Sequence, residues 1–236
     1  MAVVAAVPIL FCGRWNAMPR LLFEKTGNAV WISHLDLMRL FQRAFKRADL
    51  PLTHTQGFNP RPTVSIALPL SVGVESRCEL LDFDLDGENI PCEEIRDRLN
   101  QTLVAGIRVL DVYGSGRKLK DLSLLHCQVQ MEYDAGVPAN AIESLQNLFA
   151  AETLIVPKRT KNGMQDQNII PMIRRLKAEQ TDDNTVLLDC CVCCQNPTLN
   201  PMQLPLAVEL HLPELKPDFC KCRRIEIYDT AETIFR

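Results

Sequence analysis

The sequence lacks the features that would place it in or across a membrane. No apolar run reaches the roughly 18 residues that a membrane-spanning helix needs. The apolar start of the chain, residues 1–12, has no basic region of the kind that opens a signal peptide. We therefore expect a cytoplasmic protein that makes no membrane contact. A more regular pattern opens at Met18, so we expect Met18 to be the natural start and residues 1–17 to be a non-native or disordered extension.

The sequence also lacks the common signatures of cofactor chemistry. It has no Walker-type phosphate loop and no dinucleotide fingerprint. The absence of a Cys-x3-Cys-x2-Cys run excludes an independent radical-SAM cluster, which needs three closely spaced thiolates. The four histidines, His34, His54, His126 and His211, are scattered and define no catalytic triad. We expect no cofactor, and independent catalytic activity is not the leading hypothesis.

Ten cysteines are present, and without an export signal we expect reduced thiols. The weak candidates for a metal site are Cys191, Cys193, Cys220 and Cys222. Zinc sites normally use Cys-x2-Cys knuckles, a spacing that this cluster does not have. Buried thiols are the favoured interpretation, and metal binding and redox pairing are the alternatives.

The chain has 236 residues with an ordinary globular composition, 47% hydrophobic and 23% charged. Its net charge of −3 argues against a generic polyanion binder. The charge is uneven, however. Residues 18–62 hold seven Lys/Arg and three Asp/Glu, a balance of +4, and residues 75–100 hold three Arg and nine acids, a balance of −6. One region can therefore face an anion while the whole chain stays acidic.

The clearest element of the first half is a helix that begins at Ser33. Ser33 and Asp36 have the spacing of a capping box. The helical period predicts a buried stripe of Leu37, Leu40, Phe41, Ala44 and Ala48. The other predicted elements are strands at 20–25, 63–70, 79–85 and 107–113, a turn at 71–76 and a helix at 91–103. The order βαββαβ predicts a ferredoxin-like domain over residues 18–114.

A second series follows a Gly- and Ser-containing linker at 114–118. Its predicted elements are strands at 124–133, 154–160, 185–194 and 224–228, helices at 139–151 and 201–210, and an ambiguous segment at 168–177. We expect residues 115–236 to form a second ferredoxin-like domain that is less regular than the first. The predicted fold class is therefore α+β, with two ferredoxin-like domains built on antiparallel sheets.

Three motifs occur in order along the first half. They are Ile32-Ser33-His34-Leu35-Asp36-Leu37-Met38-Arg39 through Arg43-Ala44, then Gly57-Phe58-Asn59-Pro60-Arg61-Pro62, then Pro69-Leu70-Ser71-Val72-Gly73-Val74-Glu75-Ser76. As a set they resemble the radical-SAM-linked domain of unknown function, over nearly the whole chain from Met18. The resemblance implies an accessory role beside a radical-SAM protein. That family usually has histidine where this chain has Arg61, which counts against a role that needs an imidazole there.

The helix start offers one candidate binding site, formed by Ser33, His34, Asp36 and Arg39. A helix N-terminus can receive a phosphate or a carboxylate. The alternative is that Asp36 is a cap, His34 a surface residue and Arg39 a solvated charge. Farther along the same helix, Arg39, Arg43 and Lys46 recur at i, i+4 and i+7 and would contact phosphates.

The loop at 55–62 offers the other candidate site. Gly57, Asn59 and the prolines predict a stiff turn that presents Phe58 and Arg61. A ring beside a guanidinium can stack on a base. The alternative is that Phe58 plugs the core.

Three functions fit these residues. The leading one is an accessory substrate-binding module that works with a radical-SAM enzyme and binds RNA such as tRNA; the link from this fold to RNA is by analogy. The second is a metal-independent endoribonuclease on a doubled ferredoxin-like fold, with His34 as the candidate base. The third is a docking subunit that binds only protein.

Overall fold

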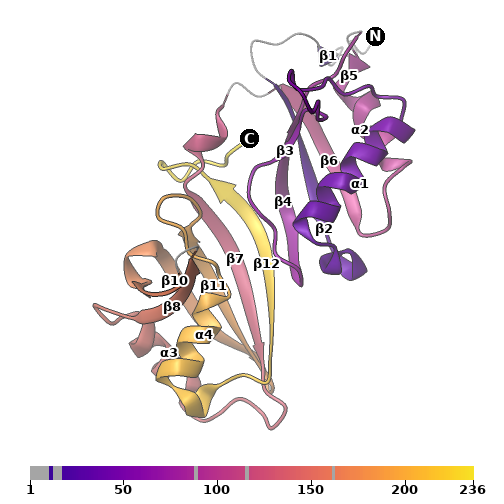
Figure 1. Cartoon of the computed structure of the whole chain (residues 1–236). Helices are drawn as coiled ribbons and strands as arrows, with labels where there is room; N and C mark the ends of the chain where they lie inside the picture. The colour runs from indigo at the N-terminus through magenta and orange to yellow at the C-terminus, as the bar shows by residue number, and fades with distance from the viewer. Residues whose placement is uncertain (1–10, 13–17, 88–89, 115–116, 161–162) are drawn as a thin grey trace, which may run out of the picture. The chain divides into compact units, whose positions relative to one another are not determined.

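The structure is a computed structural model that describes residues 11–12, 18–87, 90–114, 117–160 and 163–236 (Figure 1). The chain divides into two compact units. The first comprises residues 1–72, 78–119 and 236, and the second comprises residues 73–77 and 120–235. Both units combine helices with a sheet, which confirms the α+β class.

The first unit has the βαββαβ order predicted for it, together with two further strands of two residues each. Its elements are β1 (Phe11–Cys12), β2 (Pro19–Lys25), α1 (His34–Arg47), β3 (Val64–Ile66), β4 (Val74–Phe83), β5 (Ile90–Pro91), α2 (Cys92–Asn100) and β6 (Ile107–Gly114). The strand order β3-β4-β2-β6 places the first and third strands of the series in the centre of the sheet. β2 and β6 run antiparallel. β1 pairs with β5, and the rest of the predicted extension at 1–17 lies outside the described residues.

Aromatic side chains join α1 to the sheet of the first unit. Phe41 meets Phe23 of β2 edge to face, with ring centroids 4.7 Å apart, and Phe45 meets Phe83 of β4 at 5.0 Å. Such pairs contribute about 0.5–1.5 kcal/mol beyond the area that they bury. The buried stripe on α1 includes Phe45, whereas Leu40 of the predicted stripe is half-buried. Phe41 and Phe45 follow Leu37 by four and eight residues and therefore face the sheet with it. Leu40 follows Leu37 by three residues and lies at the edge of the buried stripe.

Two strands differ in length from their predictions. β3 covers three residues where 63–70 was expected, and β4 begins at Val74, inside the predicted turn at 71–76. The early start of β4 belongs to the second unit, where Val74, Glu75 and Ser76 pair in parallel with β12. That partner is about 148 residues away in sequence, so local periodicity cannot reveal the pairing.

The second unit is the less regular of the two. Its elements are β7 (Leu124–Glu132), α3 (Ala141–Phe149), β8 (Ile155–Thr160), β9 (Gly163–Asn168), β10 (Ile173–Asp182), β11 (Thr185–Cys193), α4 (Gln203–His211) and β12 (Phe219–Tyr228). The order β10-β11-β7-β12 repeats that of the first unit, and all three of these pairs are antiparallel. The hairpin β8–β9 is an addition to the plan, and the ambiguous segment at 168–177 leads through a 3-10 turn into β10.

The sheet of the second unit has two unlike faces. Cys127, Val129 and Met131 of β7 are buried, and α3 and α4, which contact each other, lie over one side of the sheet (Figure 1). Successive side chains on a strand point to opposite faces. The residues that alternate with these three β7 residues therefore lie on the other side of the sheet, and they are polar and partly exposed. We name this second side the polar face. Its central members are His126, Gln128, Gln130 and Glu132 of β7 and Asp189 of β11.

Among the described residues, the longest and most apolar helices still fall short of what a membrane crossing requires.

Candidate nucleic-acid interface

The start of α1 is a cap in which the polar groups satisfy one another. Ser33 Oγ accepts a hydrogen bond from the Asp36 N–H at 3.2 Å, and the Ser33 hydroxyl donates to the Asp36 carboxylate at 2.7 Å. Arg39 donates to the same carboxylate at 3.0 Å. The hydrogen bond from Ser33, followed by that from Arg39, lowers the pKa of Asp36. The Ser33 arm of the predicted capping box is present, whereas Asp36 bonds the hydroxyl instead of the backbone N–H.

His34 lies in the first turn of α1 and is half-buried. Its Nδ1 atom is buried and has no hydrogen-bond partner among the described residues. A general base must reach the proton that it abstracts. The structure places this nitrogen away from open solvent.

The basic face predicted on α1 is exposed. Arg39, Arg43 and Lys46 lie along one side of the helix, and each is exposed. Arg47 differs from them, since its guanidinium donates to the Thr102 carbonyl at 2.8 Å. Among the described residues, neither Arg43 nor Lys46 forms an ion pair, so their charges are available to an anion.

An exposed aromatic residue that the sequence analysis missed precedes this face. Trp31 is 65% exposed, at the end of a 3-10 turn (Gly27–Trp31), and Leu35 in the first turn of α1 is 66% exposed. The chain between them is anchored, because the buried Lys25 ammonium donates to the Ile32 carbonyl at 2.9 Å. Single exposed apolar residues are ordinary, but an exposed indole on an anchored segment beside basic residues is a typical binding feature.

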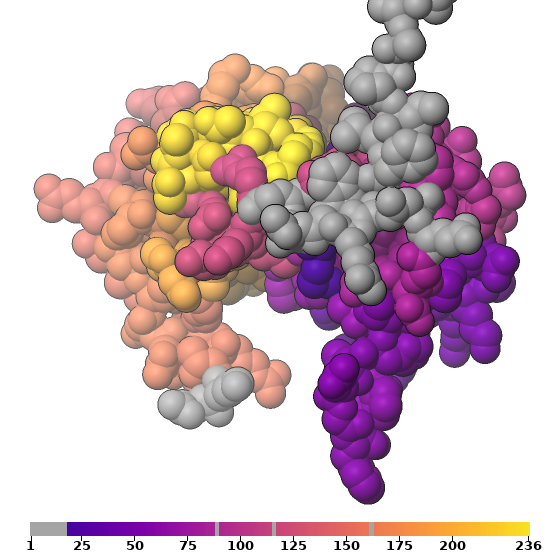
Figure 2. All heavy atoms as spheres, turned by 90° about the horizontal axis from the view of Figure 1, so that it is seen from above, coloured from indigo at the N-terminus to yellow at the C-terminus, as the bar shows by residue number. Residues whose placement is uncertain are grey.

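The second candidate segment forms a narrow projecting loop (Figure 2). Its base is closed by Thr55 N–H donating to the Arg61 carbonyl at 2.8 Å and by Arg61 N–H donating to Thr55 Oγ at 3.0 Å. Phe58 is 101% exposed, so the alternative that it plugs the core is wrong. Gly57 has φ of 141°, a conformation that strains other residues. Asn59 and Arg61 are exposed as well.

The structure does not bring the two candidate segments together. α1 has 14 residues and is therefore about 20 Å long. Ser33 and Asp36 lie at its beginning, whereas the loop at 55–62 follows its end and is tied to the end of β4 by Thr53 N–H donating to the Asp84 carbonyl (Figure 1). Lys46 is the member of the basic face at the loop's end of the helix.

The cysteines proposed as weak metal ligands are split between strands and faces. Cys191 and Cys193 lie on β11, Cys220 and Cys222 lie on β12, and β7 runs between the two strands. Neighbouring strands are about 4.8 Å apart, so the two pairs are separated by about 10 Å. Among the described residues, no group of three or more His, Cys, Asp or Glu is placed to hold a metal ion.

Burial raises the pKa of most thiols in the second unit. It raises the pKa of Cys194 to about 12 and that of Cys220 to about 11. Cys127, Cys190 and Cys222 are buried, and a hydrogen bond with Cys127 lowers the pKa of Cys222. Protonated, buried thiols are poor nucleophiles and poor metal ligands.

These features define an α+β chain of two units with a basic, aromatic-flanked helix face in the first. The sequence profile of a family described as an uncharacterized protein conserved in bacteria (DUF2344) matches residues 19–201, so the chain belongs to that family. No curated protein matches the sequence.

Two solved structures are similar to the chain at a distance. One is a chain from the crystal structure of a Cbf5-Nop10-Gar1 complex, with 8% identity, a TM-score of 0.49 and coverage of 89% of this chain. This chain spans about half of that one, 49% of its length. The other is an unknown protein from Galdieria sulphuraria, with 10% identity, a TM-score of 0.24, and coverage of 88% of this chain and 98% of that chain.

Proposed function

We propose that this chain is a substrate-binding module that binds RNA, tRNA being the expected class, and works beside a radical-SAM enzyme. In this proposal Arg39, Arg43 and Lys46 contact phosphates, and Trp31 stacks on an unpaired base. The observation that carries it is the exposure of Trp31 directly before a helix on which Arg43 and Lys46 are exposed and, among the described residues, form no ion pair. Duplex geometry hides base faces, so an exposed indole favours single-stranded RNA segments.

Charge and stacking have separate roles in this interface. Phosphate contacts release condensed counterions and give a salt-dependent affinity that does not depend on sequence. Stacking of a base on an aromatic ring contributes about 1–3 kcal/mol and depends little on salt. Arg43 and Lys46 would supply the first contribution and Trp31 the second. Phe58, on its projecting loop, would stack on a base farther along the strand.

The radical-SAM partner is supported by the resemblance of the three motifs at 32–44, 57–62 and 69–76. In this accessory role the chain would bind the RNA substrate, and the partner would carry out the radical chemistry. Recovery of a radical-SAM protein with the tagged chain from a native lysate is the expected outcome. If that protein is recovered without RNA, and the purified chain binds none, the chain is a protein-only docking subunit.

Ultraviolet crosslinking tests the RNA interface directly. The purified chain is irradiated with total tRNA, with an unstructured single-stranded RNA and with duplex DNA, and the crosslinked peptides are identified by mass spectrometry. We expect RNA adducts on the peptides that contain Trp31 and Phe58, with little adduct from duplex DNA. Adducts confined to the second unit, or none, would contradict the proposed interface.

A further inference from the structure

A histidine and a carboxylate are paired on the polar face of the second unit. His126 Nε2 lies 3.0 Å from Asp189 Oδ1 and 3.1 Å from Oδ2. Gln128 Nε2 donates to Asp189 Oδ2 at 3.0 Å, so the carboxylate is held from two sides. The side chains of His126 and Asp189 are 19% and 32% exposed. The pair is thus ordered by the sheet and still open to solvent.

The pair is fixed by strand register. Gln128 lies directly opposite Asp189 across β7 and β11, and His126 lies opposite Cys191. Side chains on neighbouring strands of a sheet are held more precisely than side chains on a loop. Among the described residues, His126 is the histidine with a carboxylate partner; His211 instead contacts the Ile155 carbonyl, with Nε2 2.8 Å from the oxygen.

Asp189 stays ionised beside His126. Burial alone would raise the pKa of Asp189, but the hydrogen bonds from Gln128 and His126 outweigh it and lower the pKa. An ionised carboxylate holds Nε2 in its protonated form, which leaves Nδ1 with the lone pair of a base.

Cations flank the pair on both sides. Arg175 and Lys177 lie on β10, and Lys177 is directly opposite Asp189. On the other side, Arg223 of β12 is directly opposite Gln128. These groups have acidic partners: Glu232 for Arg175, Glu179 for Lys177 and the partly buried Glu75 for Arg223. Exposed ion pairs contribute about 1 kcal/mol or less, so a phosphate can exchange with Glu232 and Glu179.

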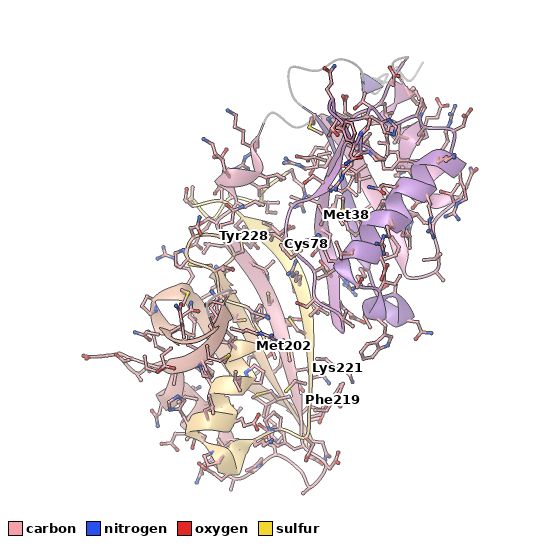
Figure 3. The ribbon with its side chains drawn as sticks, viewed as in Figure 1. Met38, Cys78, Met202, Phe219, Lys221 and Tyr228 are labelled. Atoms are coloured by element: carbon pink, nitrogen blue, oxygen red, sulfur yellow. The ribbon has the colours of Figure 1, made fainter. Side chains whose placement is uncertain are left out.

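The same face carries an exposed ring at the start of β12. Phe219 is half-exposed, and the Lys221 ammonium lies 5.5 Å from the centre of its ring (Figure 3). A ring with an adjacent cation suits a base and its phosphate. His126, the cations beside it and the Phe219 ring therefore lie on the same face of the sheet, the polar face.

We propose that His126 is the general base for metal-independent cleavage of a bound RNA strand, with Asp189 as its positioning residue. This inference rests on the proposed function, because it takes RNA as the substrate. Transesterification within RNA needs no nucleophile from the protein, since the 2′-hydroxyl of the strand attacks the adjacent phosphorus.

The reaction balances with the groups on this face. His126 Nδ1 takes the proton of the 2′-hydroxyl, the O2′–P bond forms and the P–O5′ bond breaks. The departing 5′ oxygen takes a proton from solvent, and the imidazolium returns its proton to solvent. Arg175, Lys177 and Arg223 would stabilise the charge on the phosphoryl oxygens. The products are a 2′,3′-cyclic phosphate and a 5′-hydroxyl, with no net proton consumed.

The experiment measures binding and cleavage separately with the full chain. End-labelled single-stranded RNA is incubated in chelator with the wild type, His126→Ala, Asp189→Asn and the control His211→Ala. We expect cyclic-phosphate ends from the wild type and from His211→Ala, and a rate at least about 100-fold lower for His126→Ala at unchanged RNA affinity. Free imidazole should restore part of the His126→Ala rate, which a structural role for His126 would not produce. A 2′-deoxy substitution at the cleaved position should block the reaction.

The two proposals fail in different ways. RNA that binds but is not cleaved by the wild type, or is cleaved equally by His126→Ala, overturns this inference alone. No RNA binding at all overturns it together with the proposed function. His126→Gln, checked by thermal unfolding, serves as the second variant if His126→Ala does not fold.

Discussion

Arg20 and Asp82 form a two-armed ion pair in the first unit. Arg20 Nε lies 2.6 Å from Asp82 Oδ1, and an Arg20 terminal nitrogen lies 3.1 Å from Oδ2. The Arg20 side chain is 2% exposed. The same guanidinium donates to the Arg117 carbonyl at 3.1 Å, so the pair also anchors the segment that follows β6.

Asp82→Ala should destabilise the protein strongly, because it leaves the buried Arg20 charge without this carboxylate. Removing one member of a buried pair costs about 3–5 kcal/mol. Urea unfolding measures the change in the free energy of unfolding. The control is Asp97→Ala, which removes an exposed partner of Arg96 and should cost less than about 1 kcal/mol. Equal losses in the two variants would contradict the buried role.

Trp31→Ala should weaken binding of single-stranded RNA by roughly 5- to 150-fold, the equivalent of one lost stack of about 1–3 kcal/mol. The melting temperature should change little, because the indole is mostly exposed. Fluorescence anisotropy with a labelled oligonucleotide measures the affinity. Leu35→Ala is the matched control, since it removes an equally exposed apolar side chain that cannot stack. An equal loss of RNA affinity in both variants would contradict base stacking on the Trp31 indole.

Local patterns predicted most of the first unit. The cap at Ser33 and the helical stripe through Leu37 and Phe41 follow from spacing alone, as does the order of strands and helices. The start of β4 at Val74 could not be predicted, because it depends on pairing with a strand from the other end of the chain.

In the candidate site, the sequence predicted the exposure of the charged residues but not that of the aromatic ones. Arg39, Arg43 and Lys46 are exposed as expected, since charged side chains rarely enter a core. Aromatic residues carry no such signal, so the exposure of Trp31 was missed and the burial of Phe58 was left open. The contact of His126 with Asp189 joins residues 63 positions apart, and it depends on the register of β7 and β11.

Tyr133→Phe should lower stability at neutral pH by about 1 kcal/mol. The Tyr133 hydroxyl is buried and donates to the Leu215 carbonyl at 3.0 Å, which the variant leaves without this donor. Burial also raises the pKa of Tyr133 to about 12. A raised pKa means that the unfolded chain loses the proton first, so this contribution is complete below about pH 10 and is lost as the pH rises to about 12.

Urea unfolding of both proteins at pH 8 and pH 11 tests the direction of this pH dependence of stability. The difference between the wild type and Tyr133→Phe should shrink at pH 11. A difference that grows with pH would contradict a neutral, buried phenol.

The thiols of Cys194 and Cys220 should react slowly in the folded protein. Their raised pKa values, about 12 and about 11, keep nearly all of each thiol protonated at pH 8. Because the thiolate is the reactive form, alkylation by iodoacetamide should be at least about tenfold slower than in urea. Peptide mass spectrometry after timed quenching gives the rate at each cysteine. Equal rates in folded and unfolded protein would contradict the burial of these groups.

The most direct test of the central claim is the salt dependence of RNA binding after charge reversal on α1. The variant Arg39→Glu/Arg43→Glu is compared with Arg96→Glu/Arg98→Glu, a matched pair of helix cations on α2 of the same unit. For single strands, each lost phosphate contact flattens the slope of log affinity against log salt by about 0.7. We predict a slope flatter by about 1.4 and a lower affinity for the α1 variant, with the α2 variant close to the wild type. Unchanged affinity and slope in the α1 variant would contradict an RNA interface on this helix.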